Sequence, residues 1–147
     1  MKRYTFKKHE RLTHRKIIGQ LFEKGAAVKS FPVRFKWLAT ELIEEQPAQV
    51  VISVSKRYFK KAVDRNRIKR LIRESWRMQK HRLYDACQQH DLQLAVAVIY
   101  IGKELPDFNT IDLKISLLID RLIEDIANFK SDDQSIHQTG QDEKSAT

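Results

Sequence analysis

The sequence predicts a single domain of the α+β class, and three features of the chain support this prediction. Its 147 residues suffice for one domain with one hydrophobic core, and 41% of them are hydrophobic. Stretches with helical periodicity alternate with stretches that have the pattern of strands. The chain shows no internal repeat. The predicted order is helix, strand, strand, helix, strand, helix.

The first half of the domain is predicted to contain one helix and two strands. The helix begins near Thr13, a possible N-cap, and ends at Gly25. Residues 31–40 alternate between apolar and polar side chains, which indicates a strand with one buried and one basic face. Residues 49–55 are rich in β-branched side chains and predict a second strand. The short connection between these strands suits an antiparallel hairpin, and a fourth strand arises if the first of the two bends.

The second half is predicted to contain two long helices and one strand between them. The longest helical pattern runs from Ala62 to about Gln89, with its apolar residues on one side. Residues 92–101 are almost continuously apolar, which is typical of a central strand buried on both faces. A last amphipathic helix follows, and either Asn109 or Asp107 is expected to cap its start.

Three segments are expected along the chain. Residues 1–12 form a basic arm that is expected to be flexible, and residues 13–130 form the folded domain. Residues 131–147 are polar and are predicted to be a disordered tail. The tail contains four acidic residues and one Lys, so it partly conceals the basic character of the domain in a chain whose net charge is +9.

Positive charge is concentrated in the longest predicted helix and in the segment before it. Between Lys56 and Arg82 the sequence has 12 Lys or Arg and only two acidic residues. At about 100° per residue, the helix separates into an apolar arc and a basic arc. The basic arc comprises Arg65, Lys69, Arg70, Arg73, Arg77 and Lys80.

An external polyanion is the simplest explanation for this arc, because a surface helix usually alternates its cations with acids. Arg favours phosphate, because its planar guanidinium can donate two hydrogen bonds to one group. The alternative is a solvated basic face with no ligand. An anionic membrane is disfavoured, because the apolar arc of the same helix is needed for the core.

The cellular location expected from the sequence is the cytoplasm. The single cysteine, Cys87, excludes an internal disulfide and is expected to be a small buried hydrophobic residue. The N-terminal segment lacks the apolar stretch of a signal peptide, and no apolar run approaches the ~20 residues that span a bilayer.

The sequence predicts neither a catalytic site nor a metal site on the protein. The five His residues have no spacing typical of metal ligands, and the four Gly residues form no phosphate-binding loop. Asp120, Glu124 and Asp125 form an acidic patch on the last helix, for which a solvated face is favoured over a magnesium site. No protein-bound cofactor is expected.

Residues 62–75, AVDRNRIKRLIRES, resemble the RNR signature of the bacterial ribonuclease P protein family. That signature is roughly A-x-x-R-N-R-x-K-R. The segment SVSKR, residues 53–57, resembles the strand that leads into the family's helix. The resemblance covers about residues 10–129. The residues that match the signature are Ala62, Arg65, Asn66, Arg67, Lys69 and Arg70.

The resemblance implies a helix/sheet sandwich of the order αββ(β)αβα, like the second domain of ribosomal protein S5, with a left-handed βαβ crossover. It also implies that the chain is the protein subunit of ribonuclease P, the endoribonuclease that removes the 5′ leader from precursor tRNA. The catalytic centre, with its Mg²⁺, is then expected in the RNA subunit. Neither a membrane nor an obligate protein partner is expected.

In the family, the RNR helix contacts the catalytic RNA. The corresponding contacts here are expected from Arg65, Asn66, Arg67, Lys69, Arg70 and Arg73, extended by Lys56, Arg57, Lys60 and Lys61. For Asn66 a second interpretation is that it only shapes the start of the helix.

The family also has a cleft between the first helix and the sheet that holds the single-stranded leader. Aromatic faces in such a cleft can stack on unpaired bases. Phe22 matches an aromatic position of the family, whereas Ile18, one turn earlier, departs from it. Either Phe35 or Trp37 is expected to form the floor, and plain core packing is the alternative for all three aromatic residues.

Two other functions are compatible with a basic helix on a small domain. A structural RNA-binding protein of the ribosomal type would use the same face. An autonomous nuclease or a DNA-binding regulator is disfavoured, because the sequence contains no carboxylate–histidine constellation and no dimeric helix-turn-helix pattern.

Overall fold

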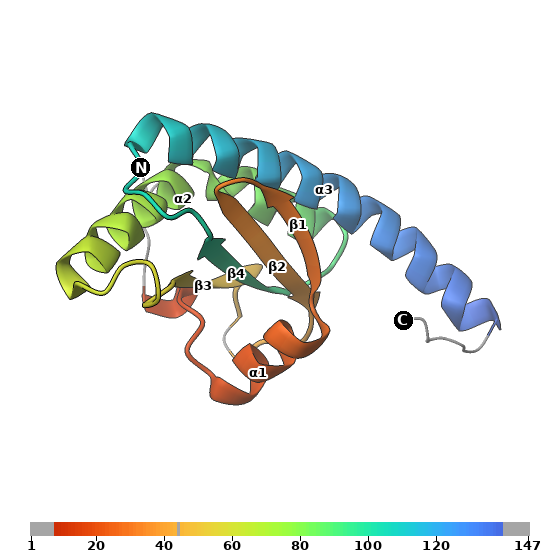
Figure 1. Ribbon diagram of the computed structural model, residues 1–147. Coiled ribbons are helices and arrows are strands. Elements are labelled where there is room, and N and C mark those ends of the chain that lie inside the picture. The colour runs from red at the N-terminus through yellow and green to blue at the C-terminus, as the bar shows by residue number, and fades with distance from the viewer. Residues whose placement is uncertain (1–7, 44, 140–147) are drawn as a thin grey trace.

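A four-stranded sheet separates the helices into two layers (Figure 1). The computed structural model describes residues 8–43 and 45–139. Helix α1 covers one face of the sheet, and helices α2 and α3 cover the other. A 3-10 turn, Lys8–Glu10, precedes the helices α1 (Arg15–Lys24), α2 (Ala62–Gln89) and α3 (Phe108–Thr139). The strands are β1 (Ala26–Ser30), β2 (Val33–Ala39), β3 (Ala48–Val54) and β4 (Leu94–Tyr100).

The strand order is β1-β2-β4-β3, so the predicted β2–β3 hairpin is wrong. Strand β4 lies between these two strands, antiparallel to β2 and parallel to β3. Strand β4 takes the central position because its residues 94–98 are fully buried, which requires helices on both faces of the strand and a paired strand on each edge. The fourth strand is β1, which ends before Phe31. It contains one buried residue, Val28, and therefore gave no periodic signal.

The core has two parts, one on each face of the sheet. Phe35 and Trp37 of β2 pack with Trp76 of α2 and with α3 in the larger cluster. Leu38, on the opposite face of β2, packs with α1 in the smaller cluster. Side chains alternate along a strand, so Arg34 shares the α1 face with Leu38. Within the described residues, none of the helices is both long enough and apolar enough to cross a membrane.

The ends of the long helices follow local hydrogen bonds. Helix α2 has the predicted bounds, and it ends in a Schellman arrangement with Asp91 in the left-handed region, at φ 55°. Helix α3 is capped by Asp107, whose Oδ1 accepts from the Thr110 N–H at 2.8 Å. This hydrogen bond lowers the pKa of Asp107. Helix α1 starts after His14 without a side-chain cap, so the predicted cap at Thr13 is wrong.

The two outer segments differ from the prediction where the structure describes them. Residues 8–12 are packed against the domain, because Leu12 N–H donates to Val50 O at 2.8 Å and Glu10 is 5% exposed. These contacts, and the pairing of Glu10 with Lys80, hold residues 8–12 against β3 and α2. At the other end, α3 continues through residues 131–139, which were predicted to be disordered. Residues 1–7 and 140–147 lie outside the described residues.

Candidate nucleic-acid interface

The basic arc of α2 divides into two halves with different partners. In its C-terminal half, Arg77 pairs with Glu74 at 2.6 Å, and this hydrogen bond raises the pKa of Arg77. Lys80 is buried and pairs with Glu10, a contact that ties residues 8–12 to α2. Arg82, just beyond the arc, pairs with Asp120 of α3. The prediction of one continuous basic face is therefore wrong for Arg77 and Lys80, because the protein's own carboxylates neutralise them.

The cations in the N-terminal half of α2 keep their positive charge. Arg67 and Arg70 are exposed, and Lys69 and Arg73 are half-buried. Among the residues that the structure describes, no carboxylate forms an ion pair with these four side chains. Burial lowers the pKa of Arg73, and the nearby charges of Arg11 and Arg70 lower it further. We call Asn66, Arg67, Lys69, Arg70 and Arg73 the RNR face.

Asn66 does not shape the start of the helix. The N-cap is Lys61, and Asn66 is the fifth residue of α2. Its side chain is exposed and makes no hydrogen bond to any part of the chain that the structure describes. An exposed amide that both donates and accepts is available to a ligand on this face.

Arg65 has a structural role in addition to the RNA contact that the sequence predicts. Its Nη1 donates to the carbonyl of Phe59 at 2.7 Å and to that of Lys60 at 3.0 Å. Arg65 therefore fixes the loop before α2, which we call the basic loop. The basic loop contains the exposed cations Lys56, Arg57, Lys60 and Lys61. Arg65 positions these cations, and its loss would disturb the loop as well as any RNA contact.

Phe35 and Trp37 do not form the floor of a cleft beside α1. Phe35 is fully buried and meets Trp76 edge-on, with ring centroids 6.0 Å apart. Trp37 is 5% exposed and meets Phe129 of α3 at 5.7 Å. Both rings lie on the face of the sheet opposite α1. Plain core packing, the alternative considered for both residues, is what the structure shows.

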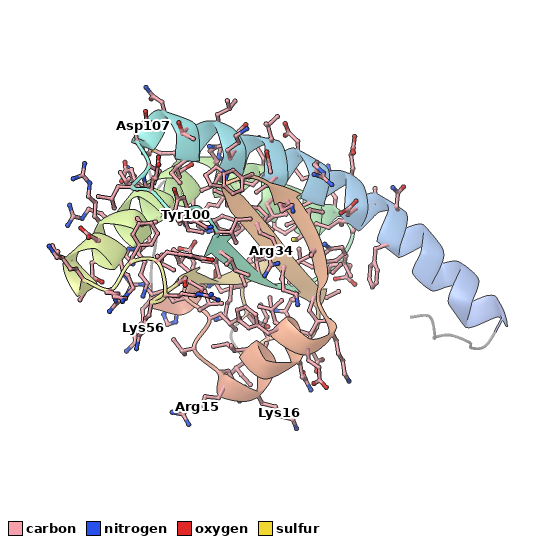
Figure 2. The ribbon with its side chains drawn as sticks, viewed as in Figure 1. Arg15, Lys16, Arg34, Lys56, Tyr100 and Asp107 are labelled. Carbon is pink, nitrogen blue, oxygen red and sulfur yellow. The ribbon has the colours of Figure 1, made fainter. Side chains whose placement is uncertain are left out.

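The residues next to them in sequence lie on the α1 side instead. Arg34 pairs across the sheet with Lys29 on β1 and with Ile99 on β4, which in turn pairs with Ser53 on β3. We call this row the open sheet face. Figure 2 shows Arg34 on the sheet above α1, and Lys56 at the start of the basic loop. The alternation of residues 31–40 predicts that Arg34 lies on the basic face of the strand, but alternation alone does not predict a role for it.

Arg34 is a candidate ligand-binding residue because of an unused donor. Its Nε is buried and has no hydrogen-bond partner within the described part of the chain. Arg34 as a whole is half-buried and has no carboxylate partner among the described residues, so an anion on the open sheet face would neutralise it. Phe22, at the end of α1, is 39% exposed, and Lys36 Nζ donates to its carbonyl at 2.6 Å. Ile18 is partly buried in the α1 cluster.

A small groove connects the RNR face with the edge strand β3. It has a volume of about 200 Å³ and lies between residues 11–13, β3 and α2. Its cations are Arg11, Lys69 and Arg73. Three cations around an apolar floor suit a phosphate group at this edge.

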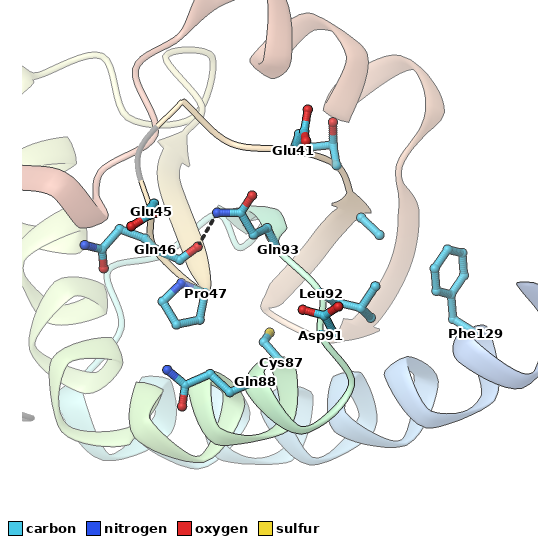
Figure 3. Close-up of a pocket in the computed structure, with 12 residues that line it drawn as sticks. Glu41, Glu45, Gln46, Pro47, Cys87, Gln88, Asp91, Leu92, Gln93 and Phe129 are labelled. Atoms are coloured by element: carbon cyan, nitrogen blue, oxygen red, sulfur yellow. Dashed lines mark hydrogen bonds between the residues drawn. The ribbon is translucent and has the colours of Figure 1, made fainter.

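The opposite end of the sheet is acidic. A cavity of about 660 Å³ lies where β3 and β4 begin, and Glu41, Glu45 and Asp91 line it (Figure 3). Gln93 Nε2 donates there to the carbonyl of Gln46 at 2.9 Å. Negative charge at this end disfavours phosphate and directs a polyanion to the basic end. In the described parts of the chain, no group of three or more His, Cys, Asp or Glu residues is arranged to hold a metal ion.

The α+β fold and the exposed cations of the RNR face are typical of a protein that binds a polyanion such as RNA. A family model described as Ribonuclease P matches residues 6–119. The chain belongs to the bacterial ribonuclease P protein family. It is thus the protein subunit of the endoribonuclease that matures the 5′ end of precursor tRNA, and it associates with the RNA of that enzyme. Because the chain belongs to this family, the two alternatives of a ribosomal RNA-binding protein and an autonomous nuclease are disfavoured.

Curated relatives agree with this assignment. The ribonuclease P protein component of Porphyromonas gingivalis ATCC 33277 is 36% identical over 105 residues, which is 71% of this chain and 77% of that protein. The component of Chlorobium phaeobacteroides DSM 266 is 34% identical over 125 residues, 78% of this chain and 86% of that protein.

Two solved structures show the same fold. The RNase P protein of Staphylococcus aureus matches with a TM-score of 0.59 and 23% identity, covering 77% of this chain and 94% of that one. The RNase P protein of Thermotoga maritima matches with a TM-score of 0.58 and 24% identity, covering 76% and 96%.

Proposed function

We propose that the RNR face binds the catalytic RNA of ribonuclease P, and that the open sheet face holds the single-stranded 5′ leader of precursor tRNA. The observation that supports the first half is the absence, among the described residues, of any carboxylate paired with Arg67, Lys69, Arg70 or Arg73. Concentrating unpaired cations costs self-repulsion, and RNA phosphates would offset it. The basic loop extends this contact.

The leader proposal rests on Arg34 and on its surroundings. Arg34 offers a cation without a carboxylate partner among the described residues, and Phe22 is exposed at the end of α1 on the same side of the sheet, so a phosphate and an unpaired base would both find a partner. This arrangement replaces the aromatic floor that was expected from Phe35 or Trp37. The cleavage chemistry remains with the RNA and its Mg²⁺, and the protein contributes binding and orientation of the leader.

Three finer points belong to the same proposal. The β3–α2–β4 crossover is left-handed, as in the second domain of ribosomal protein S5. The protein works in the cytoplasm. It needs no second protein to act with its RNA.

Addition of the protein should raise the rate at which catalytic RNA cleaves precursor tRNA at low Mg²⁺. We expect a stimulation of at least about tenfold, equivalent to about 1.4 kcal/mol of extra transition-state binding. Single-turnover cleavage of a precursor with a labelled 5′ end measures it, with heat-denatured protein as the control. An unchanged rate at saturating protein would contradict the proposed function.

Replacing Arg34 with Ala should weaken binding of precursor tRNA to the holoenzyme by about tenfold, because a charge-assisted hydrogen bond is lost. Binding of mature tRNA, which has no leader, should not change. Lys114→Ala is the charge-matched control, since Lys114 lies on α3, behind the other face of the sheet. Equal losses for precursor and mature tRNA would show that Arg34 does not contact the leader.

A further inference from the structure

An apolar pocket lies at the basic end of the sheet, outside both surfaces described above. It has a volume of about 500 Å³, within the range typical of small-molecule sites. Phe31, on the β1–β2 turn, is 63% exposed at this pocket, and Leu105 is 47% exposed. Single exposed apolar side chains are ordinary, but several of them grouped around one pocket indicate a ligand site. The pocket therefore suits a ligand with an apolar face.

The floor of the pocket is fixed by the chain around it. A Cβ on Gly102 would overlap the ring of Tyr100, so only glycine allows this close approach. The Tyr100 hydroxyl donates to the carbonyl of Glu104 at 2.6 Å and holds the loop after β4. Figure 2 shows Tyr100 at the end of β4 and Asp107 at the start of α3, on the two sides of this loop. The pocket is thus preformed.

The rim of the pocket carries one cation, Lys103, and one carboxylate, Glu104, and Lys103 connects it with the basic loop. Lys103 lines the pocket, and its Nζ lies 5.2 Å from the ring centroid of Tyr58 in the basic loop. Arg57 also lies over that ring, at 5.8 Å. Val54 and Tyr100 pair in adjacent parallel strands, so the loops that follow them leave the sheet side by side. Tyr58 joins the cations of the two loops.

We propose that this pocket takes an unpaired nucleobase of the catalytic RNA, stacked on Phe31, with the neighbouring phosphate on Lys103. The inference rests on the proposed function, because it places a second contact beside the RNR face on the same RNA. A nucleobase combines a flat apolar face with an adjacent negative charge, and Phe31 and Lys103 offer a partner to each. A peptide or lipid chain would match the apolar walls but not the cation at the rim.

The experiment compares binding of the catalytic RNA to the wild type and to four variants: Phe31→Ala, Phe31→Trp, Lys103→Gln and Lys114→Ala. Phe31→Ala should weaken binding about tenfold, and Phe31→Trp should bind as the wild type does, because stacking on an aromatic ring contributes at this scale. Lys103→Gln should reduce the slope of log K against log salt by about 1. Lys114→Ala is the control on α3 and should change little. Phe31 is exposed, so its variants should fold.

Base-specific chemical probing of the bound RNA distinguishes base capture from other contacts. With the wild type and Phe31→Trp, at least one unpaired base should lose its reactivity, and with Phe31→Ala it should regain it. Equal affinities for Phe31→Ala and the wild type would overturn the inference while leaving the proposed function intact. Weaker binding without any change in base reactivity would also overturn it, since Phe31 would then contact something other than a base. If the wild type itself does not bind the catalytic RNA, that result contradicts the proposed function, whatever the variants do.

Discussion

Replacing Arg67 and Arg70 together with Ala should weaken binding of the catalytic RNA by about 100-fold at low salt, because two charge-assisted phosphate contacts are lost. Both side chains are exposed on the RNR face and have no carboxylate partner among the described residues. The folded state should therefore tolerate the change. The slope of log K against log salt should become shallower by about 2, since two fewer counterions are released.

Arg77→Ala with Arg82→Ala is the matched control for this test. It removes the same charge from the same helix, but these two cations are already paired with Glu74 and Asp120. We expect little loss of RNA affinity from the control and a change in stability of less than about 1 kcal/mol for each exposed pair. Filter binding across a salt series measures both variants. If the two double variants lost affinity equally, net charge alone would explain binding, and the RNR face would not be a specific site.

Arg65 is kept unchanged in this test because it has a second role. The family resemblance marks Arg65 as strongly as Arg67, yet the structure uses Arg65 to fix the basic loop through the carbonyls of Phe59 and Lys60. A loss of binding in an Arg65 variant would combine a missing contact with a displaced loop. Arg70 has no such second role, so it makes the cleaner partner for Arg67.

The sequence predicted the long helix and its N-terminal cations because both depend on local spacing. A period of 3.6 residues placed Ile68 and Ile72 on one side of α2 and Arg70 on the other, and all three lie as expected. The bounds of α2 also agree, because they depend on residues close by in the chain. Predictions of this kind need no knowledge of how distant segments pack.

What the sequence could not predict depends on contacts between distant residues. Alternation along β2 separated Phe35 from Arg34, but it did not say which of the two faces meets α1. That choice follows from where the larger core forms, and α2 and α3 supply it together. The pairing of Glu10 with Lys80 joins residues 70 positions apart, so no local pattern signals it. Lys80 was therefore assigned to the wrong environment.

The second large effect concerns this same pair and acts on stability. Glu10→Ala should lower the free energy of unfolding by about 3–5 kcal/mol, because it leaves the Lys80 ammonium buried without this carboxylate. The side chains of Glu10 and Lys80 are 7% and 4% exposed, so water cannot easily replace the lost partner. The Tyr84 hydroxyl, which donates to Glu10 at 2.8 Å, also loses its acceptor. Burial raises the pKa of Tyr84, and the charge of the nearby Glu10 raises it further, so the hydroxyl keeps its proton and remains a donor.

Urea unfolding of three variants separates the cost of a buried charge from the loss of a contact. Glu74→Ala breaks the exposed pair with Arg77, and we expect it to cost less than about 1 kcal/mol. Glu10→Ala combined with Lys80→Met removes the stranded charge and should recover most of the stability that Glu10→Ala alone loses. If Glu10→Ala were no more harmful than Glu74→Ala, residues 8–12 would not be held to α2 by this pair.

The pair of Glu10 and Lys80 also affects the RNA-binding surface. Arg11 follows Glu10 and borders the groove that contains Lys69 and Arg73, so the pair positions one side of this groove. For that reason Glu10→Ala should also weaken RNA binding, although Glu10 itself is buried away from the RNR face.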